Sequence, residues 1–204
     1  MIPIFPLPNV VLFPNVFLPL YIFEERYQVM VSDALKGDRI IGMVLLRGGE
    51  SSAAVPVPPV YPVGCSGVIT HSEALDDGCF NIVLRGLERF RIVEEDHSLS
   101  YRQATVEKIA EKPVVGDELL AYRERLEELL MHRHVDSSAV DSNVSLMPDV
   151  DLINALSQYL ELDPVEKQSL LERDGVVKRC RSLIELLEMQ ALLNGQRFPP
   201  VALQ

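Results

Sequence analysis

Hydrophobic residues in the first half of the chain follow the two-residue period of β-strands. Short runs of β-favouring residues at 2–4, 10–13 and 16–23 are separated by proline and asparagine. The same reasoning predicts further strands at 39–46, 63–71, 79–86, 89–95 and 101–109. The sequence Asp76-Asp77-Gly78 predicts the turn of a hairpin between the runs at 63–71 and 79–86.

Helical spacing occurs once among these strands and dominates after Pro113. A first helix is predicted at 24–36, with Gly37 as its C-terminal cap. Later helices are predicted at 117–132, 149–160, 164–172 and 176–193. Asp163, Pro164 and Glu166 have the spacing of a capping box. The last helix carries one apolar stripe, formed by Val176, Cys180, Leu183, Ile184, Leu187 and Ala191.

The change of period predicts an α+β protein with two parts. Residues 1–112 form a β-rich subdomain with one helix, and residues 113–204 form a helical subdomain. Two segments without a regular period, 47–62 and 135–148, are predicted to be loops. The first of them contains adjacent glycines, adjacent serines and four prolines, which fit neither a strand nor a helix.

Composition and charge reduce the number of functions that the protein can have. The formal net charge of −11 disfavours attraction to phosphate or to anionic membranes. Three cysteines without metal-like spacing indicate reduced, buried thiols, and hence a cytoplasmic protein. The apolar start lacks a basic leader and is interrupted by five prolines, so we expect it to form strands and turns instead of a signal peptide or a membrane span.

Two motifs carry a resemblance to a known family. The first is Phe5-Pro6-Leu7, then Val10 to Pro14, Leu18-Pro19-Leu20 and Phe23-Glu24-Glu25-Arg26-Tyr27. The second runs from Val63-Gly64 and Gly67-Val68-Ile69 to Ile82-Val83-Leu84-Arg85-Gly86-Leu87-Glu88-Arg89-Phe90. Together they resemble the N-terminal, substrate-binding domain of Lon proteases, which also occurs in cereblon and in small stand-alone bacterial proteins. A weaker similarity covers Leu160 to Leu187.

The resemblance implies a fold and a role. The fold is a β-rich pseudo-barrel of the PUA-like kind followed by a C-terminal helical bundle, and the role is recognition of polypeptides. The sequence contains no G-x-x-x-x-G-K-[ST] phosphate loop. We therefore expect a stand-alone domain that has no catalytic residues and needs no cofactor.

The other reactive residue types of the sequence also favour a non-catalytic protein. The four histidines show no pairing with a nucleophile. Cys65, His71 and Cys79 would meet across the predicted hairpin, but they lack a fourth metal ligand. We therefore expect no metal site.

RNA binding is the alternative function, because PUA-like folds grip nucleic acid elsewhere. Arg85, Arg89 and Arg91 lie close together on the predicted strands. Acidic residues alternate with them, and the whole chain is acidic, so internal ion pairing is the favoured role and nucleic acid is an unfavoured partner.

Binding of unfolded or client polypeptides requires apolar surface that the fold leaves exposed. Two segments are candidates, a proline turn and the proline-rich loop. The candidate residues are Phe13, Phe17, Val55, Val57, Val60 and Tyr61. The competing interpretation is that each of them packs beneath its own loop.

The size of such a surface limits its affinity. Burying a patch of about 300–600 Å² at about 25 cal/mol per Å² contributes roughly 8–15 kcal/mol of favourable binding free energy. Association itself costs about 4–15 kcal/mol, so the net affinity is weak. Weak binding of this kind needs several copies or a tether. The expected partners are therefore further copies in a weak homo-oligomer, or an ATP-dependent protease or chaperone.

Overall fold

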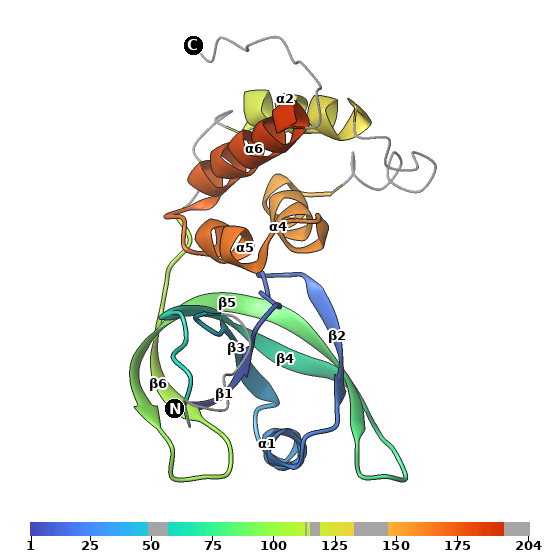
Figure 1. Ribbon diagram of the computed structural model, residues 1–204, viewed down its shortest axis with the longest axis vertical. Coiled ribbons are helices and arrows are strands. Elements are labelled where there is room, and N and C mark those ends of the chain that lie inside the picture. The colour runs from blue at the N-terminus through green and yellow to red at the C-terminus, as the bar shows by residue number, and fades with distance from the viewer. Residues whose placement is uncertain (49–56, 113, 115–118, 133–146, 194–204) are drawn as a thin grey trace. The chain divides into compact units, whose positions relative to one another are not determined.

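The computed structural model describes residues 1–48, 57–112, 114, 119–132 and 147–193 (Figure 1). The elements in chain order are β1 (Ile2–Leu7), β2 (Phe17–Ile22), α1 (Glu25–Lys36), β3 (Ile40–Leu45), β4 (Val63–Ala74), β5 (Phe80–Asp96), β6 (Gln103–Lys108), α2 (Leu120–His132), α4 (Asp149–Tyr159), α5 (Pro164–Leu171) and α6 (Val176–Leu193). The predicted α+β class is confirmed, with the strands preceding most of the helices.

The six strands form one sheet that closes on itself. Their order is β2-β5-β4-β3-β1-β6, and a further pairing joins β5 to β6. Strands β5, β4, β3, β1 and β6 therefore make a ring, in which only the β1–β3 pair is parallel. Strand β2 lies outside the ring and pairs with the first half of β5 (Figure 1). The expected pseudo-barrel is confirmed.

Strand β5 is longer than the sequence predicts. The runs at 79–86 and 89–95 were expected to be separate strands, but they are one continuous strand. Gly86 lies in its middle, and a Cβ atom at this position would come within 2.0 Å of the Phe13 carbonyl oxygen. The glycine is therefore needed where another backbone crosses the strand closely, and it is not a break in the strand.

The segment 10–13 is not a strand, which corrects the prediction. It is irregular but buried, with Leu12 1% and Phe13 0% exposed. The Phe13 N–H donates to Oε1 of Gln158 at 2.9 Å instead of entering a ladder. The hydrophobic run was therefore a sign of burial and not of strand pairing.

Helix α1 packs against β1. Its buried side chains are Tyr27, Met30, Val31 and Ala34. The Tyr27 ring centroid lies 4.4 Å from that of Phe5 on β1. Gly37 ends the helix as predicted, and its N–H donates to the Ala34 carbonyl.

The predicted capping box at Asp163 and Glu166 is also present at the start of α5.

Contacts divide the chain into two compact units. One contains Met1–Ala110 and Asn154–Glu172, and the other contains Glu111–Ile153 and Arg173–Gln204. These units do not coincide with the predicted subdomains 1–112 and 113–204. The domain boundary at 112/113 therefore stays a prediction. The difference arises because α5 and most of α4 belong to the unit that holds the strands.

The second unit is built on α2 and α6. All six residues of the predicted stripe on α6 are buried. Arg125 on α2 joins the two helices, since its guanidinium pairs with Glu188 on α6 at 2.7 Å. The predicted helix at 176–193 has the bounds of α6, and the predicted loop at 135–148 lies largely outside the described residues.

Candidate functional site

Two of the predicted binding residues are inside the protein. Phe13 is 0% exposed and Val60 is 9% exposed. Val60 forms a β-bridge with Leu46 and belongs to the barrel core. Their exposure was predicted wrongly, because the turn and the end of the loop pack onto the barrel, and neither residue is available to a partner.

The remaining residues of the proline-rich loop have mixed positions. Val57 is 48% exposed. Tyr61 is half-buried, its N–H donates to the Leu45 carbonyl at 2.9 Å, and the Arg47 guanidinium lies 5.1 Å from its ring centroid. Val55 lies outside the described residues.

Phe17 is exposed and has aromatic neighbours. Phe17 is 50% exposed, Tyr21 54% and Phe23 63%. We call these three residues the aromatic strip. The alternation of β2 explains it, because Phe17, Pro19 and Tyr21 are exposed and point to the face opposite the core. Tyr21 and Phe23 were not among the predicted residues, although their spacing from Phe17 follows the two-residue period of one strand face.

The far end of the aromatic strip is held in place by local contacts. The Tyr21 and Phe23 rings are stacked, with centroids 6.1 Å apart. A hydrogen bond between the side chains of Tyr21 and Cys79 raises the pKa of Tyr21. The Cys79 N–H in turn donates to the Asp77 carboxylate. Because Ile22 pairs with Phe80, this end of the strip lies beside the turn between β4 and β5.

Helix α4 supports the near end of the aromatic strip. The Phe17 carbonyl accepts hydrogen bonds from Gln158 Nε2 at 3.0 Å and from Tyr159 Oη at 2.8 Å. Asn154 Nδ2 donates to the Pro14 carbonyl at 3.1 Å. These contacts fix the backbone at the start of β2 while its aromatic side chains stay exposed.

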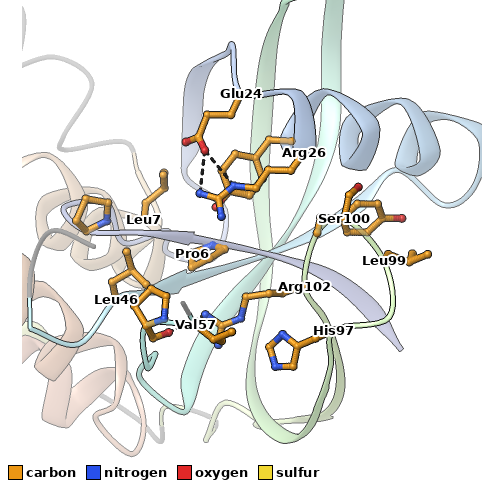
Figure 2. Close-up of a pocket in the computed structure, with 14 residues that line it drawn as sticks. Pro6, Leu7, Glu24, Arg26, Leu46, Val57, His97, Leu99, Ser100 and Arg102 are labelled. Atoms are coloured by element: carbon orange, nitrogen blue, oxygen red, sulfur yellow. Dashed lines mark hydrogen bonds and ion pairs between the residues drawn. The ribbon is translucent and has the colours of Figure 1, made fainter. Parts of the chain in front are cut away.

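A pocket of about 370 Å³ lies at a second place in the same unit. Figure 2 shows its walls, which come from the end of β1, the start of α1, the residue after β3, the end of the proline-rich loop and the segment between β5 and β6. The lining residues are Pro6, Leu7, Pro8, Glu24, Arg26, Tyr27, Leu46, Val57, Pro58, His97, Leu99, Ser100, Tyr101 and Arg102. Val57 is thus a wall of this pocket, and Phe17 is not.

Two arginines in the pocket are held by carboxylates. Arg26 pairs with Glu24 at 2.8 Å, and both side chains are substantially exposed (Figure 2). Arg102 is mostly buried and pairs with Glu95. Its Nη1 also donates to the Pro58 carbonyl at 2.9 Å, which ties the proline-rich loop to the segment between β5 and β6.

Charged side chains of the pocket change the pKa of Tyr27. Burial raises the pKa of Tyr27, and so does the Glu24 charge, whereas Arg26 and Arg102 act in the opposite direction. A positive charge favours the phenolate form, so both guanidiniums act on one oxygen atom of the pocket wall.

The surface offers less to the alternative RNA function than the sequence suggested. Arg89 is 1% exposed, and its Nη1 donates to the Leu171 carbonyl at 2.8 Å. Arg89 is therefore internal, as expected. This contact, however, is with a backbone carbonyl and not with a carboxylate. Arg85 and Arg91 are exposed. One of the three clustered arginines is thus withdrawn from any nucleic-acid contact.

Cys65, Cys79 and Cys180 are buried, and none is in a disulfide. Within the described ranges, no group of three or more His, Cys, Asp or Glu side chains is placed to hold a metal ion. In that same part of the chain, every helix is too short or too polar to cross a membrane.

Solved structures share the fold. The N-terminal domain of a Mycobacterium avium complex Lon protease superimposes with a TM-score of 0.72 at 16% identity, covering 91% of this chain and 97% of that one. A Lon N-terminal domain protein from Xanthomonas campestris gives a TM-score of 0.62 at 22% identity, covering 96% of this chain and 98% of that one.

Curated relatives are similar in sequence over nearly the whole chain. A Lon protease of Cytophaga hutchinsonii is 28% identical over 194 residues, which is 92% of this chain and 24% of the relative. A Lon protease of Dictyoglomus thermophilum is 28% identical over 215 residues, which is 96% of this chain and 26% of the relative. The chain thus spans about a quarter of the length of these relatives.

The family model for the ATP-dependent protease La (LON) substrate-binding domain matches residues 1–189. Because this match covers most of the 204 residues, the chain belongs to the family of Lon substrate-binding domains.

Proposed function

We propose that the protein is a non-catalytic module that binds unfolded polypeptide segments through the aromatic strip. The observation that carries this proposal is the exposure of Phe17, Tyr21 and Phe23, each at least half accessible within seven residues of sequence. A single exposed aromatic residue is ordinary, whereas neighbouring ones on a supported strand are typical of an interaction surface.

The physical basis is the removal of apolar surface from water. Unfolded segments expose the apolar side chains that folded proteins bury, and contact with the strip would cover both surfaces. Aromatic rings suit this role because they offer a large contact area and lose little conformational freedom. The binding would therefore select unfolded chains over folded ones without reading a particular sequence.

The edge of β2 favours contact through side chains over the addition of a strand. Pro19 has no N–H to donate to an incoming strand. The Phe17 carbonyl already accepts hydrogen bonds from Gln158 and Tyr159. A client would consequently lie across the rings, and its backbone would not extend the sheet.

Family membership supports the proposed partners, and the cysteines support the proposed location. The curated relatives are Lon proteases, so an ATP-dependent protease that receives the bound client is part of this proposal. Weak self-association would raise the retention of a client in the same way as a tether. Buried cysteines that form no disulfide support a cytoplasmic location.

The test compares two triple variants. In the first, Phe17, Tyr21 and Phe23 are changed to serine. In the control, Val93, Leu120 and Met189 are changed to serine, because these residues are 56%, 55% and 59% exposed and lie outside the strip. Fluorescence anisotropy would measure binding of a labelled, reduced and carboxymethylated protein to each variant.

We expect the strip variant to bind the unfolded client at least about tenfold more weakly, since each lost ring contributes on the order of 1 kcal/mol. The control should stay close to the parent protein. Equal binding by the strip variant and the parent would refute the strip as the contact surface. Equal losses in both variants would show nonspecific hydrophobic adhesion instead.

A further inference from the structure

The pocket in Figure 2 contains two guanidiniums, in a protein whose net charge is −11. Arg26 and Arg102 line it, and their partners are the Glu24 carboxylate in the lining and the Glu95 carboxylate, which is not part of the lining. A guanidinium that can exchange its partner attracts an anion even in an acidic protein, because nearby charges outweigh distant, screened ones.

The two guanidiniums belong to the lining of the same pocket. Arg26 lies over the Tyr27 ring, with Cζ 4.5 Å from the centroid. Arg26 and Arg102 both act to lower the pKa of Tyr27, and so both favour negative charge on its oxygen. An anionic ligand in the pocket would be stabilised by both cations in the same way.

Both arginines have hydrogen-bonding capacity for a ligand. The pair between Arg26 and Glu24 is exposed, with 53% and 41% of the side chains accessible, so it is weak and exchangeable. Arg102 uses its Nε, Nη1 and Nη2 in contacts with Glu95 and Pro58. A guanidinium has five N–H groups, so these contacts leave donors for a further acceptor.

The other walls are apolar and belong to four segments. Leu7, Leu46, Val57 and Leu99 supply aliphatic side chains around the charged wall. Val57 and Leu99 remain 48% and 47% exposed, so a bound group would cover them further. A volume of about 370 Å³ lies at the small end of ligand pockets and suits a group of one or two residues.

We propose that this pocket binds the C-terminal carboxylate of a polypeptide whose last residues are apolar. The carboxylate lies between Arg26 and Arg102, and the last side chains contact Val57 and Leu99. A bidentate contact with a guanidinium matches the geometry of a carboxylate. The site is separate from the aromatic strip, so it adds a recognition of chain ends to the proposed function.

A peptide fits the lining better than a free fatty acid does. Glu24 can accept a hydrogen bond from an amide N–H, and the Ser100 hydroxyl can donate to or accept from a peptide group. A fatty acid would leave these polar groups unused and facing its apolar tail, which carries a desolvation cost.

The experiment uses the full chain and three probes. The probes are N-acetyl-Leu-Leu with a free carboxylate, the same dipeptide as its C-terminal amide, and octanoate. Titration calorimetry would measure the affinity of each. We expect the dipeptide acid to bind, and the amide and octanoate to bind at least about tenfold more weakly, because charge-assisted hydrogen bonds are lost in one and amide contacts in the other.

Two matched variants test the position of the carboxylate. Arg26→Gln and Lys36→Gln each remove one exposed cation from an ion pair on α1, but only Arg26 lines the pocket. Arg26→Gln should weaken the dipeptide acid about five- to tenfold, and Lys36→Gln should not. Val57→Asp, at an exposed wall position, should also weaken the acid by repulsion and provides a second test if Arg26→Gln folds poorly.

Three results would overturn the proposal. Equal binding of the dipeptide acid and its amide would show that the pocket does not recognise a carboxylate. Tighter binding of octanoate than of the dipeptide acid would assign the pocket to a free fatty acid. Equal losses in Arg26→Gln and Lys36→Gln would leave only a general charge effect. The strip variant keeps every residue of the pocket lining, so failure of the strip as a client surface can be told apart from failure of the pocket.

Discussion

Gln158 on α4 and Phe13, 145 positions apart in the sequence, are joined by a hydrogen bond inside the protein. The Phe13 N–H donates to Gln158 Oε1 at 2.9 Å. Nε2 of the same amide donates to the Phe17 carbonyl at 3.0 Å. One side chain thus satisfies two backbone groups on either side of the turn that precedes the aromatic strip.

Replacing Gln158 by leucine should lower the free energy of unfolding by about 1–3 kcal/mol, since a buried backbone donor loses this acceptor. Tyr159→Phe removes a bond to the same Phe17 carbonyl from a residue that is 63% exposed. It should cost less than about 1 kcal/mol, because water can replace the hydroxyl. Urea denaturation would measure both. Equal effects would contradict the assigned role of Gln158.

Gly86→Ala should destabilise the protein strongly. The added Cβ would lie 2.0 Å from the Phe13 carbonyl oxygen and 2.8 Å from its carbon, which are backbone atoms. Gly67 pairs directly with Gly86, but a Cβ there would meet the Leu12 Cδ2 atom at 2.9 Å. A side-chain methyl can move, so Gly67→Ala should cost about 1–3 kcal/mol and Gly86→Ala more. Thermal melts that rank them in the reverse order would contradict the close crossing at Phe13.

The Cys180 thiol should resist alkylation in the folded protein. It is 0% exposed, and burial, with a smaller effect of Asp149, raises its pKa from 9.0 to about 12. The thiolate is the reactive form, so at about pH 8 its fraction is on the order of one in ten thousand. Peptide mapping after maleimide treatment should find Cys180 labelled only in denaturant. Rapid labelling of the native protein would show that α6 opens readily.

The raised pKa of Cys180 also makes the stability of the fold depend on pH. The raised pKa of Cys180 means that the fold favours the neutral thiol. The associated stability is fully present below the pKa of the unfolded thiol, near 9.0, and decreases as the pH rises towards about 12. Denaturation curves from about pH 8 to pH 11 should show this loss. A Cys180→Ala variant should show less of it, and an identical decrease in both proteins would assign the effect to other groups.

Binding of an unfolded client to the aromatic strip should tolerate salt. Apolar contact is not screened, and the acidic chain provides no general electrostatic attraction. Raising sodium chloride from about 0.1 to 1 M should leave the anisotropy signal unchanged or strengthen it. Binding to the pocket should weaken over the same range, because it depends on charge. Loss of client binding in moderate salt would favour a charged or nucleic-acid partner.

The purified chain should hydrolyse neither ATP nor casein. Its 204 residues contain no phosphate-loop motif, and the described part of the structure holds no cluster of metal ligands. The measurement is phosphate release and fluorogenic casein cleavage across successive chromatographic fractions. An activity that coelutes with the protein would contradict the non-catalytic role.

Local chemistry was sufficient to predict several elements from the sequence. The stripe on α6 was predicted in full, because one buried face imposes its period on the sequence. The hairpin turn at Gly78, with a φ of 83°, and the capping box at Asp163 also depend only on neighbouring residues. The family motifs carried the fold class, although no period in the sequence reveals a closed barrel.

Long-range contacts decided what the sequence left open. The run at 10–13 has the composition of a strand, but its Phe13 N–H is bound by a helix far along the chain. The exposure of Tyr21 and Phe23 follows from the position of β2 outside the ring, which strand composition does not encode. The pocket needs five separate segments to converge. Each of these features depends on which residues meet in space, and that is set by the packing of the whole barrel and not by the residues nearby in sequence.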